Sequence, residues 1–231
     1  MTNYPLAWPA DWPRKNDAQR ADARFGRKDR RTVNYTNGAS SSYTTTKALP
    51  RRGAVMKRLI ETTLDGEAGC ILSDCEQYRY RLWRQWDDSR PALGFIMLNP
   101  STADHQVNDP TITRCMQRAQ AGKYGRLEVV NLFPLRSTDP DGLLAHAEPL
   151  GREDTANGAI MDAIDRCSRV ICAWGAHKAA PARAVEVLRI IRMCGRGNLL
   201  YHLGLNQDGT PKHPLYVAAK TRPARFTVNS A

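Results

Sequence analysis

The sequence of 231 residues predicts an α/β sandwich around a mostly parallel, four-stranded central sheet. Short, continuous apolar runs, typical of strands that are buried on both faces, alternate with segments of helical periodicity. Glycine and proline residues stand at the borders between these segments. A hydrophobic content of 42% is sufficient for one sizeable core.

Four apolar runs are the expected strands, and three amphipathic segments between them are the expected helices. The strands are expected at 92–98, 127–133, 169–174 and 198–204, and the helices at 109–122, 152–168 and 181–195. Asp109 and Pro110 suit the cap and the first turn of the first helix. Before this unit, residues 70–86 mix alternation with aromatic side chains, which indicates a strand or a hairpin.

Positive charge is concentrated at the N-terminus. Residues 1–58 contain thirteen Lys and Arg against four Asp, which accounts for +9 of the net charge of +11. We therefore predict a flexible, basic arm and linker at 1–54, and a folded domain at 55–231. Such an arm is suited either to sequence-independent contact with DNA phosphates or to a solvated, disordered tail, and both readings stay open.

Several absences narrow the class of protein. The six cysteines form no CxxC pair, and no apolar stretch approaches the roughly 20 residues that span a bilayer. The N-terminus has no apolar signal core, so we expect a cytoplasmic protein without membrane contact. The phosphate-binding, dinucleotide-binding and zinc-hydrolase motifs are all missing, and we expect neither a metal nor a cofactor. The oligomeric state stays open.

Polar or aromatic residues follow each apolar run, where ligands bind in parallel sheets. They are Asn99, Pro100, Ser101, Thr102 and Asp104 after the first run, Asn108 and Asp109 at the start of the first helix, Asn131 and Phe133 at the end of the second run, Trp174, Gly175 and His177 at and just beyond the end of the third, and Lys212 and His213 beyond the fourth. We expect them to converge on one rim of the sheet. Each also has a structural alternative, such as a turn or cap for Asn99 and Asp104, or core packing for Trp174.

The motifs "MLNPSTAD", "NDPTITRC", "VVNLFPLRSTDP", "WGAH" and "LGLNQDGTPKHPLY", in this order, resemble a bacterial and phage family known as domain of unknown function 1643. This resemblance covers residues 58–226. A more distant likeness is to the uracil-DNA glycosylases. "IMLNP" is similar to their first motif, "VVNLF" to the strand whose Asn reads the flipped base, "VICAWGAHKAA" to their Trp-Gly strand, and "KHPLY" to their His-Pro loop. The likeness implies a three-layer sandwich of the glycosylase type.

The same likeness implies roles for single residues. Asn99 would hold a water near the sugar, Asn131 would pair with the polar edge of an extruded base, and His213 would stabilise negative charge on that base. Asp104 or Asp109 would be the charged partner of the cationic sugar. The implied activity is cleavage of the N-glycosidic bond of a modified or damaged base in DNA or a nucleotide. Two alternatives stay open: a phage-type enzyme that transfers a group to a base, and a modified-base-binding protein without catalysis.

Two departures from the glycosylase pattern are visible. The His-Pro loop lacks the second Ser-Pro, which leaves a leucine wedge without support. Residues 101–104 and 108–111 have no clear equivalent in the glycosylase motifs. These departures indicate a changed pocket and hence a different base or reaction.

Overall fold

The computed structural model describes residues 32–35, 43–46 and 56–227. The predicted arm at 1–54 lies outside these residues, apart from two short strands, β1 (Thr32–Tyr35) and β2 (Tyr43–Thr46). The first long strand, β3, begins at Met56, close to the predicted border of the folded domain.

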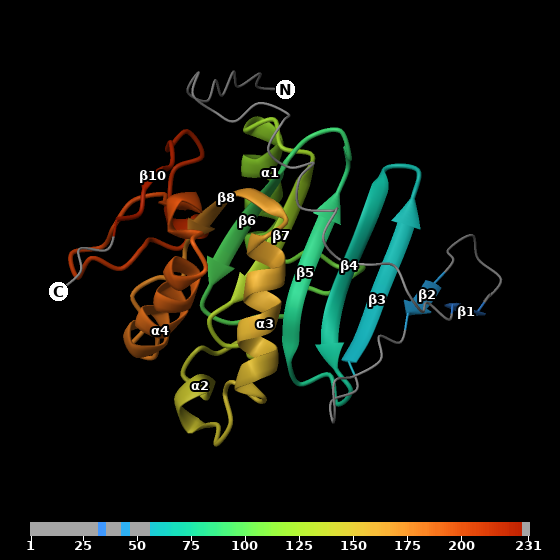
Figure 1. Ribbon diagram of the computed structural model, residues 1–231, viewed down its shortest axis with the longest axis horizontal. Helices are drawn as coiled ribbons and strands as arrows, with labels where there is room; N and C mark the ends of the chain where they lie inside the picture. Colours follow the sequence, from blue (N-terminus) through green and yellow to red (C-terminus); the bar gives the residue numbers. More distant parts are fainter. Residues whose placement is uncertain (1–31, 36–42, 47–55, 228–231) are drawn as a thin grey trace.

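The main strands form one mixed sheet (Figure 1). They are β3 (Met56–Thr63), β4 (Gly66–Ser73), β5 (Arg79–Gln85), β6 (Ala92–Met97), β7 (Arg126–Asn131), β8 (Cys167–Cys172), β9 (Leu200–His202) and β10 (Ala224–Arg225). The strand order is β1-β2-β3-β4-β5-β7-β6-β8-β9-β10. Strands β7, β6, β8 and β9 are parallel to one another, and every other pairing is antiparallel.

The α/β class and the four parallel strands at the centre are confirmed. The expectation of a mostly parallel, four-stranded sheet is wrong for the sheet as a whole, because β3, β4 and β5 add an antiparallel meander beside β7. The first of these strands, β3, gives no clear signal in the sequence because its residues are not buried. All six residues of β6 are buried, whereas β3 contains no buried residue, so β3 lacks the apolar run that marks a strand of the core.

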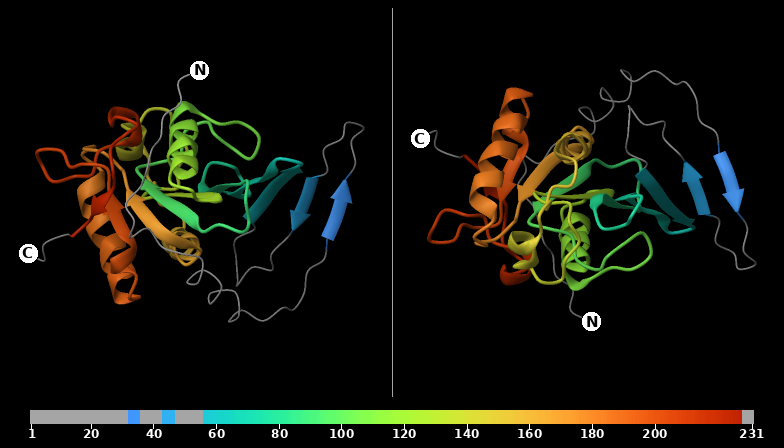
Figure 2. Two further views of the ribbon diagram at one scale, coloured as in Figure 1. Left: turned by 90° about the horizontal axis from the view of Figure 1, so that it is seen from above. Right: turned by 90° about the horizontal axis from the view of Figure 1, so that it is seen from below.

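Helices cover both faces of the sheet, as Figure 2 shows. They are α1 (Pro110–Ala121), α2 (Gly142–Ala145), α3 (Glu153–Ile164) and α4 (Ala180–Met193). Residues of α2, α3 and α4 share one hydrophobic core with the sheet, and residues of α1 share the other. The three predicted helices are confirmed, while α2 is too short for a periodic signal and was not expected.

Alternate residues of the central strands enter opposite cores. Phe95 and Val129 belong to the core beneath α1, while their neighbours Ile96 and Val130 belong to the core beneath α3 and α4. This two-sided burial explains why the strands are continuous apolar runs.

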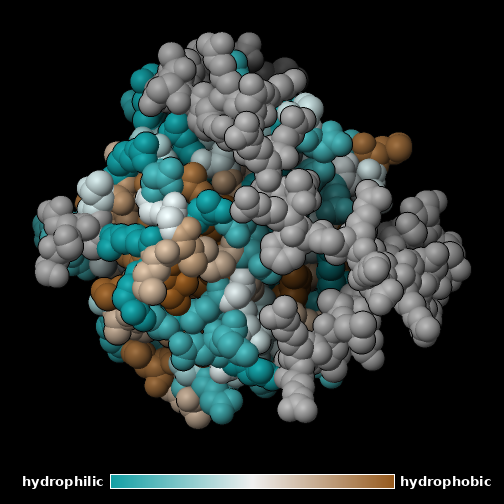
Figure 3. Space-filling model, viewed as in Figure 1, coloured by the Kyte–Doolittle hydropathy of each residue, from teal (hydrophilic) through white to brown (hydrophobic). Residues whose placement is uncertain are grey.

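Apolar surface is also visible among hydrophilic residues on the side of the molecule shown in Figure 3. Among the described residues, no helix has both the length and the apolar composition needed to cross a bilayer.

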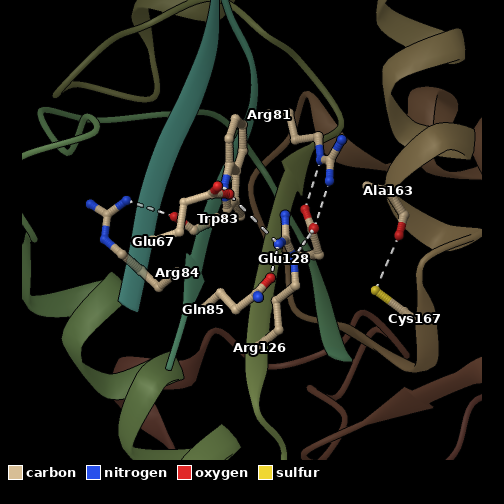
Figure 4. A network of polar contacts seen from close by, with 9 residues as sticks. All are labelled: Glu67, Arg81, Trp83, Arg84, Gln85, Arg126, Glu128, Ala163 and Cys167. Atoms are coloured by element: carbon tan, nitrogen blue, oxygen red, sulfur yellow. Dashed lines mark hydrogen bonds and ion pairs between the residues drawn. The ribbon is translucent and has the colours of Figure 1, made fainter. Parts of the chain in front are cut away.

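A buried charged network ties β5 to β7 (Figure 4). The carboxylate of Glu128 accepts two hydrogen bonds from Arg81, at 2.7 and 2.6 Å, and one from Nε of Arg126, at 2.6 Å. Nε1 of Trp83 donates to Glu67 at 2.7 Å, and the Arg81 and Arg126 guanidinium groups lie 5.1 and 5.6 Å from the Trp83 ring centroid. The side chain of Glu128 is 0% exposed. Among the described residues, Arg81 and Arg126 form ion pairs with it, and their positive charges compensate its buried negative charge.

Candidate functional site

The loops after β6 and β7 are joined at the carboxyl end of the sheet. The backbone N–H of Ser137 donates to the carbonyl of Pro100 at 2.9 Å. In return, the Asn99 side-chain amide donates to the carbonyl of Ser137 at 2.8 Å. Asn99 therefore connects the two loops through its Nδ2 group.

The loops after β8 and β9 meet at the same end of the strands. The N–H of Gly175 donates to the carbonyl of Pro211 at 2.9 Å, and Gly175 has a φ of +78°, which favours glycine. His177 reaches back to the loop after β7, where its Nε2 lies 3.2 Å from a carboxylate oxygen of Asp141. The loops that carry the predicted residues thus contact one another, as expected for the ends of neighbouring parallel strands.

Two buried arginines of β5 hold the loop after β6, and sequence reasoning missed both. Nη1 of Arg79, which is 2% exposed, donates to the carbonyl of Ala103 at 2.5 Å. Arg84 donates from Nε to Oδ1 of Asn108 at 2.9 Å and from Nη2 to the carbonyl of Asp104 at 2.5 Å. Burial lowers the pKa of Arg79 to about 10, although the charge of Asp109 opposes this shift. The available signal was the repetition of arginine in "RYRLWR" within a segment of strand periodicity.

Buried arginines also anchor the other parts of the rim. Nε of Arg183 donates to the carbonyl of Leu132, just beyond the end of β7, at 3.0 Å. Arg118, on α1, donates to the carbonyls of Val217 and Ala218, both at 2.9 Å. A guanidinium carries five donors in a fixed plane, so one side chain can satisfy several loop carbonyls at once.

Two predicted polar residues, Asp104 and Asp109, make hydrogen bonds that define local structure. Oδ1 of Asp104 accepts from the N–H groups of Gln106 and Val107, at 2.8 and 2.9 Å, and closes a turn. Partial burial raises the pKa of Asp104, but these backbone donors outweigh burial and hold the pKa below its usual value. Asp109 caps α1, because its Oδ1 accepts from the N–H of Ile112 at 2.8 Å. Asp104 therefore stabilises a turn and Asp109 caps a helix in the structure.

His213 begins the short 3-10 helix η3 (Pro214–Tyr216), which packs near α1. Its Nδ1 accepts from the N–H of Leu215 at 3.4 Å, an arrangement that leaves the proton of the neutral ring on Nε2. Burial lowers the pKa of His213 below its usual value, and the negative charge of Asp109 acts in the opposite direction.

Replacing Asp109 by asparagine should lower the pKa of His213 further. The substitution retains a cap for α1, since asparagine accepts the same backbone hydrogen bond, but it removes the charge that favours the imidazolium. NMR titration of the His213 ring measures the effect, and Asp104→Asn is the matched control. An unchanged pKa in Asp109→Asn would show that the two side chains do not interact.

Asn131, the last residue of β7, differs from these residues. It is 4% exposed, and its Nδ2 is buried without a hydrogen-bond partner in the part of the chain that the structure describes. Most buried polar groups are bonded, and an unbonded one costs about 1–3 kcal/mol. Asn131 therefore presents an unused donor at the carboxyl end of a central strand, beside Met97 of β6.

The remaining predicted residues divide into core and surface. Phe133 and Trp174 belong to the core on the side of α3 and α4, and Trp174 packs edge-on against Phe226 at a centroid distance of 5.8 Å. Thr102, Asn108 and Lys212 are exposed, and Ser101 is partly exposed. No group of three or more His, Cys, Asp and Glu side chains within the described segments is arranged to hold a metal ion.

Comparison with known proteins places the chain in a family. A family model described as a protein of unknown function (DUF1643) matches residues 79–215. This segment runs from Arg79 of β5, through the four strand-end loops, to Leu215 of η3. Neither the curated proteins nor the solved structures contain a match. Because the family model covers more than half of the chain, the protein belongs to the DUF1643 family.

Proposed function

We propose that this protein is a cytoplasmic, nucleobase-directed enzyme that cleaves the N-glycosidic bond of a modified or damaged base in DNA or in a nucleotide. The observation that carries the proposal is the buried Nδ2 of Asn131 at the rim, which has no hydrogen-bond partner among the described residues. A carboxamide offers a donor and an acceptor side by side, which complements the amide-like edge of a base. A bound base would supply the partner that Nδ2 lacks.

His213 is suited to the departing base. Cleavage leaves negative charge on the base, and a neutral imidazole with its proton on Nε2 can donate a hydrogen bond to that charge. Burial keeps the pKa of His213 low, which favours the neutral ring. The likeness of "KHPLY" to the glycosylase His-Pro loop supports the same role.

Asn99 is suited to positioning the water. Its Nδ2 is held by the carbonyls of Pro100 and Ser137, at 3.1 and 2.8 Å, so the orientation of the side chain is fixed. Oδ1 is then the group that would accept a hydrogen bond from the attacking water and orient it. The charged partner of the cationic sugar would be Asp109 rather than Asp104, because Asp109 acts electrostatically on both His213 and Arg79.

The arrangement of elements supports a glycosylase-type sandwich. Four parallel strands carry helices on both faces, and all the proposed groups follow carboxyl ends of these strands. Phosphate contacts from the basic arm at 1–54 would add affinity for DNA that depends on salt and not on sequence.

The proposal is tested by incubating the full chain with oligonucleotides that carry uracil or modified pyrimidines. We expect abasic sites from the wild type, and a loss of at least about a hundredfold in rate for His213→Ala, the range typical of a lost acid–base or charge-stabilising group. Asn198→Ala, at an exposed residue of the turn before the start of β9, is the control. A mass increase on the DNA would favour group transfer, and binding without any product would favour the non-catalytic reader; either outcome contradicts the proposal.

A further inference from the structure

The helix η3 presents two apolar side chains to solvent beside His213. Tyr216 is 83% exposed and Leu215 is 39% exposed, although both follow the buried Pro214. The ring of Tyr216 lies 5.8 Å from the ring of His213, at an interplanar angle of 53°. An exposed aromatic side chain next to a candidate site is a feature that folding alone does not require.

These exposed side chains stand on a firmly held segment. Pro214 before them and Val217 after them are buried. The guanidinium of Arg118 donates to carbonyls of Val217, Ala218, Ala219 and Thr221, at 2.9, 2.9, 3.3 and 3.3 Å. Because these hydrogen bonds already fix the backbone, binding of a partner at this surface would cost little conformational entropy.

The segment that contains η3 is basic. Residues 209–227 contain four Lys and Arg and no Asp or Glu. Three of these, Lys212, Lys220 and Arg222, are exposed and form no ion pair with another described residue. Lys220 lies within the segment that Arg118 holds, so it is close to η3 in space as well as in sequence.

A single exposed aromatic with unpaired cations fits a nucleic-acid strand better than a protein surface. Two apolar side chains are far too few for a stable protein interface, which buries about 800 Å² on each partner. Base stacking on one aromatic ring and phosphate contact with several cations are, by contrast, the usual means of holding single-stranded nucleic acid.

We propose that η3 and the residues on either side of it bind single-stranded DNA, with Tyr216 stacked on a base and Lys212, Lys220 and Arg222 in contact with phosphates. The inference rests on the proposed function only for the choice of DNA as the ligand. It assigns a surface outside the catalytic groups, and this surface would hold the strand that flanks the reacting nucleotide.

The experiment is a fluorescence-anisotropy titration of a labelled single-stranded oligonucleotide of mixed sequence with the full chain. We expect Tyr216→Ala to weaken binding about tenfold or more, and Tyr216→Trp to retain wild-type affinity, because stacking needs an aromatic ring. Val185→Ala, which alters an exposed apolar residue of α4, is the matched control and should have no effect. Thermal unfolding of each variant establishes that the fold is retained.

Salt dependence tests the cations separately. Lys220→Ala and Arg222→Ala should each reduce the slope of log affinity against log salt concentration by about 0.7. Equal affinity of Tyr216→Ala and the wild type, or unchanged salt slopes, would overturn the inference. Binding needs no cleavage, so Tyr216-dependent binding without abasic sites would support this inference while the proposed function fails, and cleavage with Tyr216-independent binding would do the reverse.

Discussion

Replacing Glu128 by alanine should lower the free energy of unfolding by about 3–5 kcal/mol. The Glu128 side chain is fully buried and lies between the guanidinium groups of Arg81 and Arg126. Both arginines are themselves largely buried, with side chains 9% and 19% exposed, so neither can recover hydration once the carboxylate is removed. The large cost arises from the buried charge of Arg81, which loses its carboxylate partner, and from the lost hydrogen bonds; Arg126 keeps an ion pair with Glu67 at 3.9 Å.

Urea denaturation of the wild type and of Glu128→Ala measures this difference in the free energy of unfolding. Glu76→Ala is the matched control, because Glu76 forms a surface pair with Lys57 at 2.9 Å, with side chains 53% and 37% exposed. Surface pairs of this kind contribute at most about 1 kcal/mol. A Glu128→Ala protein as stable as Glu76→Ala would show that the buried network does not hold β5 to β7.

The centre of the fold could be predicted from sequence because two-sided burial leaves a strong pattern. Strands β6, β7 and β8 are apolar runs between helices, and their parallel pairing follows from that alternation. The antiparallel strand β3 could not be recognised in the same way, since it has no buried residue. Its place is set by its pairing with β4, and pairing between half-exposed strands is weakly encoded in the chain.

The rim could be predicted only in part. The position of Asn131 at a strand end follows from the apolar run before it, but the lack of a partner for its Nδ2 is a property of the folded chain. Arg79 and Arg84 were missed because alternation in β5 suggests that polar residues face solvent. In the structure, the loop after β6 covers them, through contacts with Ala103 and Asn108 that lie more than twenty residues away in sequence.

Replacing Asn131 by alanine should weaken binding of the target base without lowering the stability of the fold. The buried Nδ2 makes no hydrogen bond to a described residue, so its removal relieves an unsatisfied donor and should leave the melting temperature unchanged or higher. Binding of the target base should weaken by about ten- to a hundredfold, the effect of losing a two-point contact with a base edge. A structural asparagine would behave in the opposite way, with lower stability and unaltered binding.

The most direct measurement is a pair of titrations, in which wild type and Asn131→Ala bind an oligonucleotide carrying the base that yields abasic sites. Thermal unfolding of the same two samples accompanies the titrations. The proposed rim predicts a large loss of affinity in Asn131→Ala, with a melting temperature at or above that of the wild type. Equal affinity for the two proteins, at equal stability, would contradict the assignment of Asn131 as the residue that reads the base.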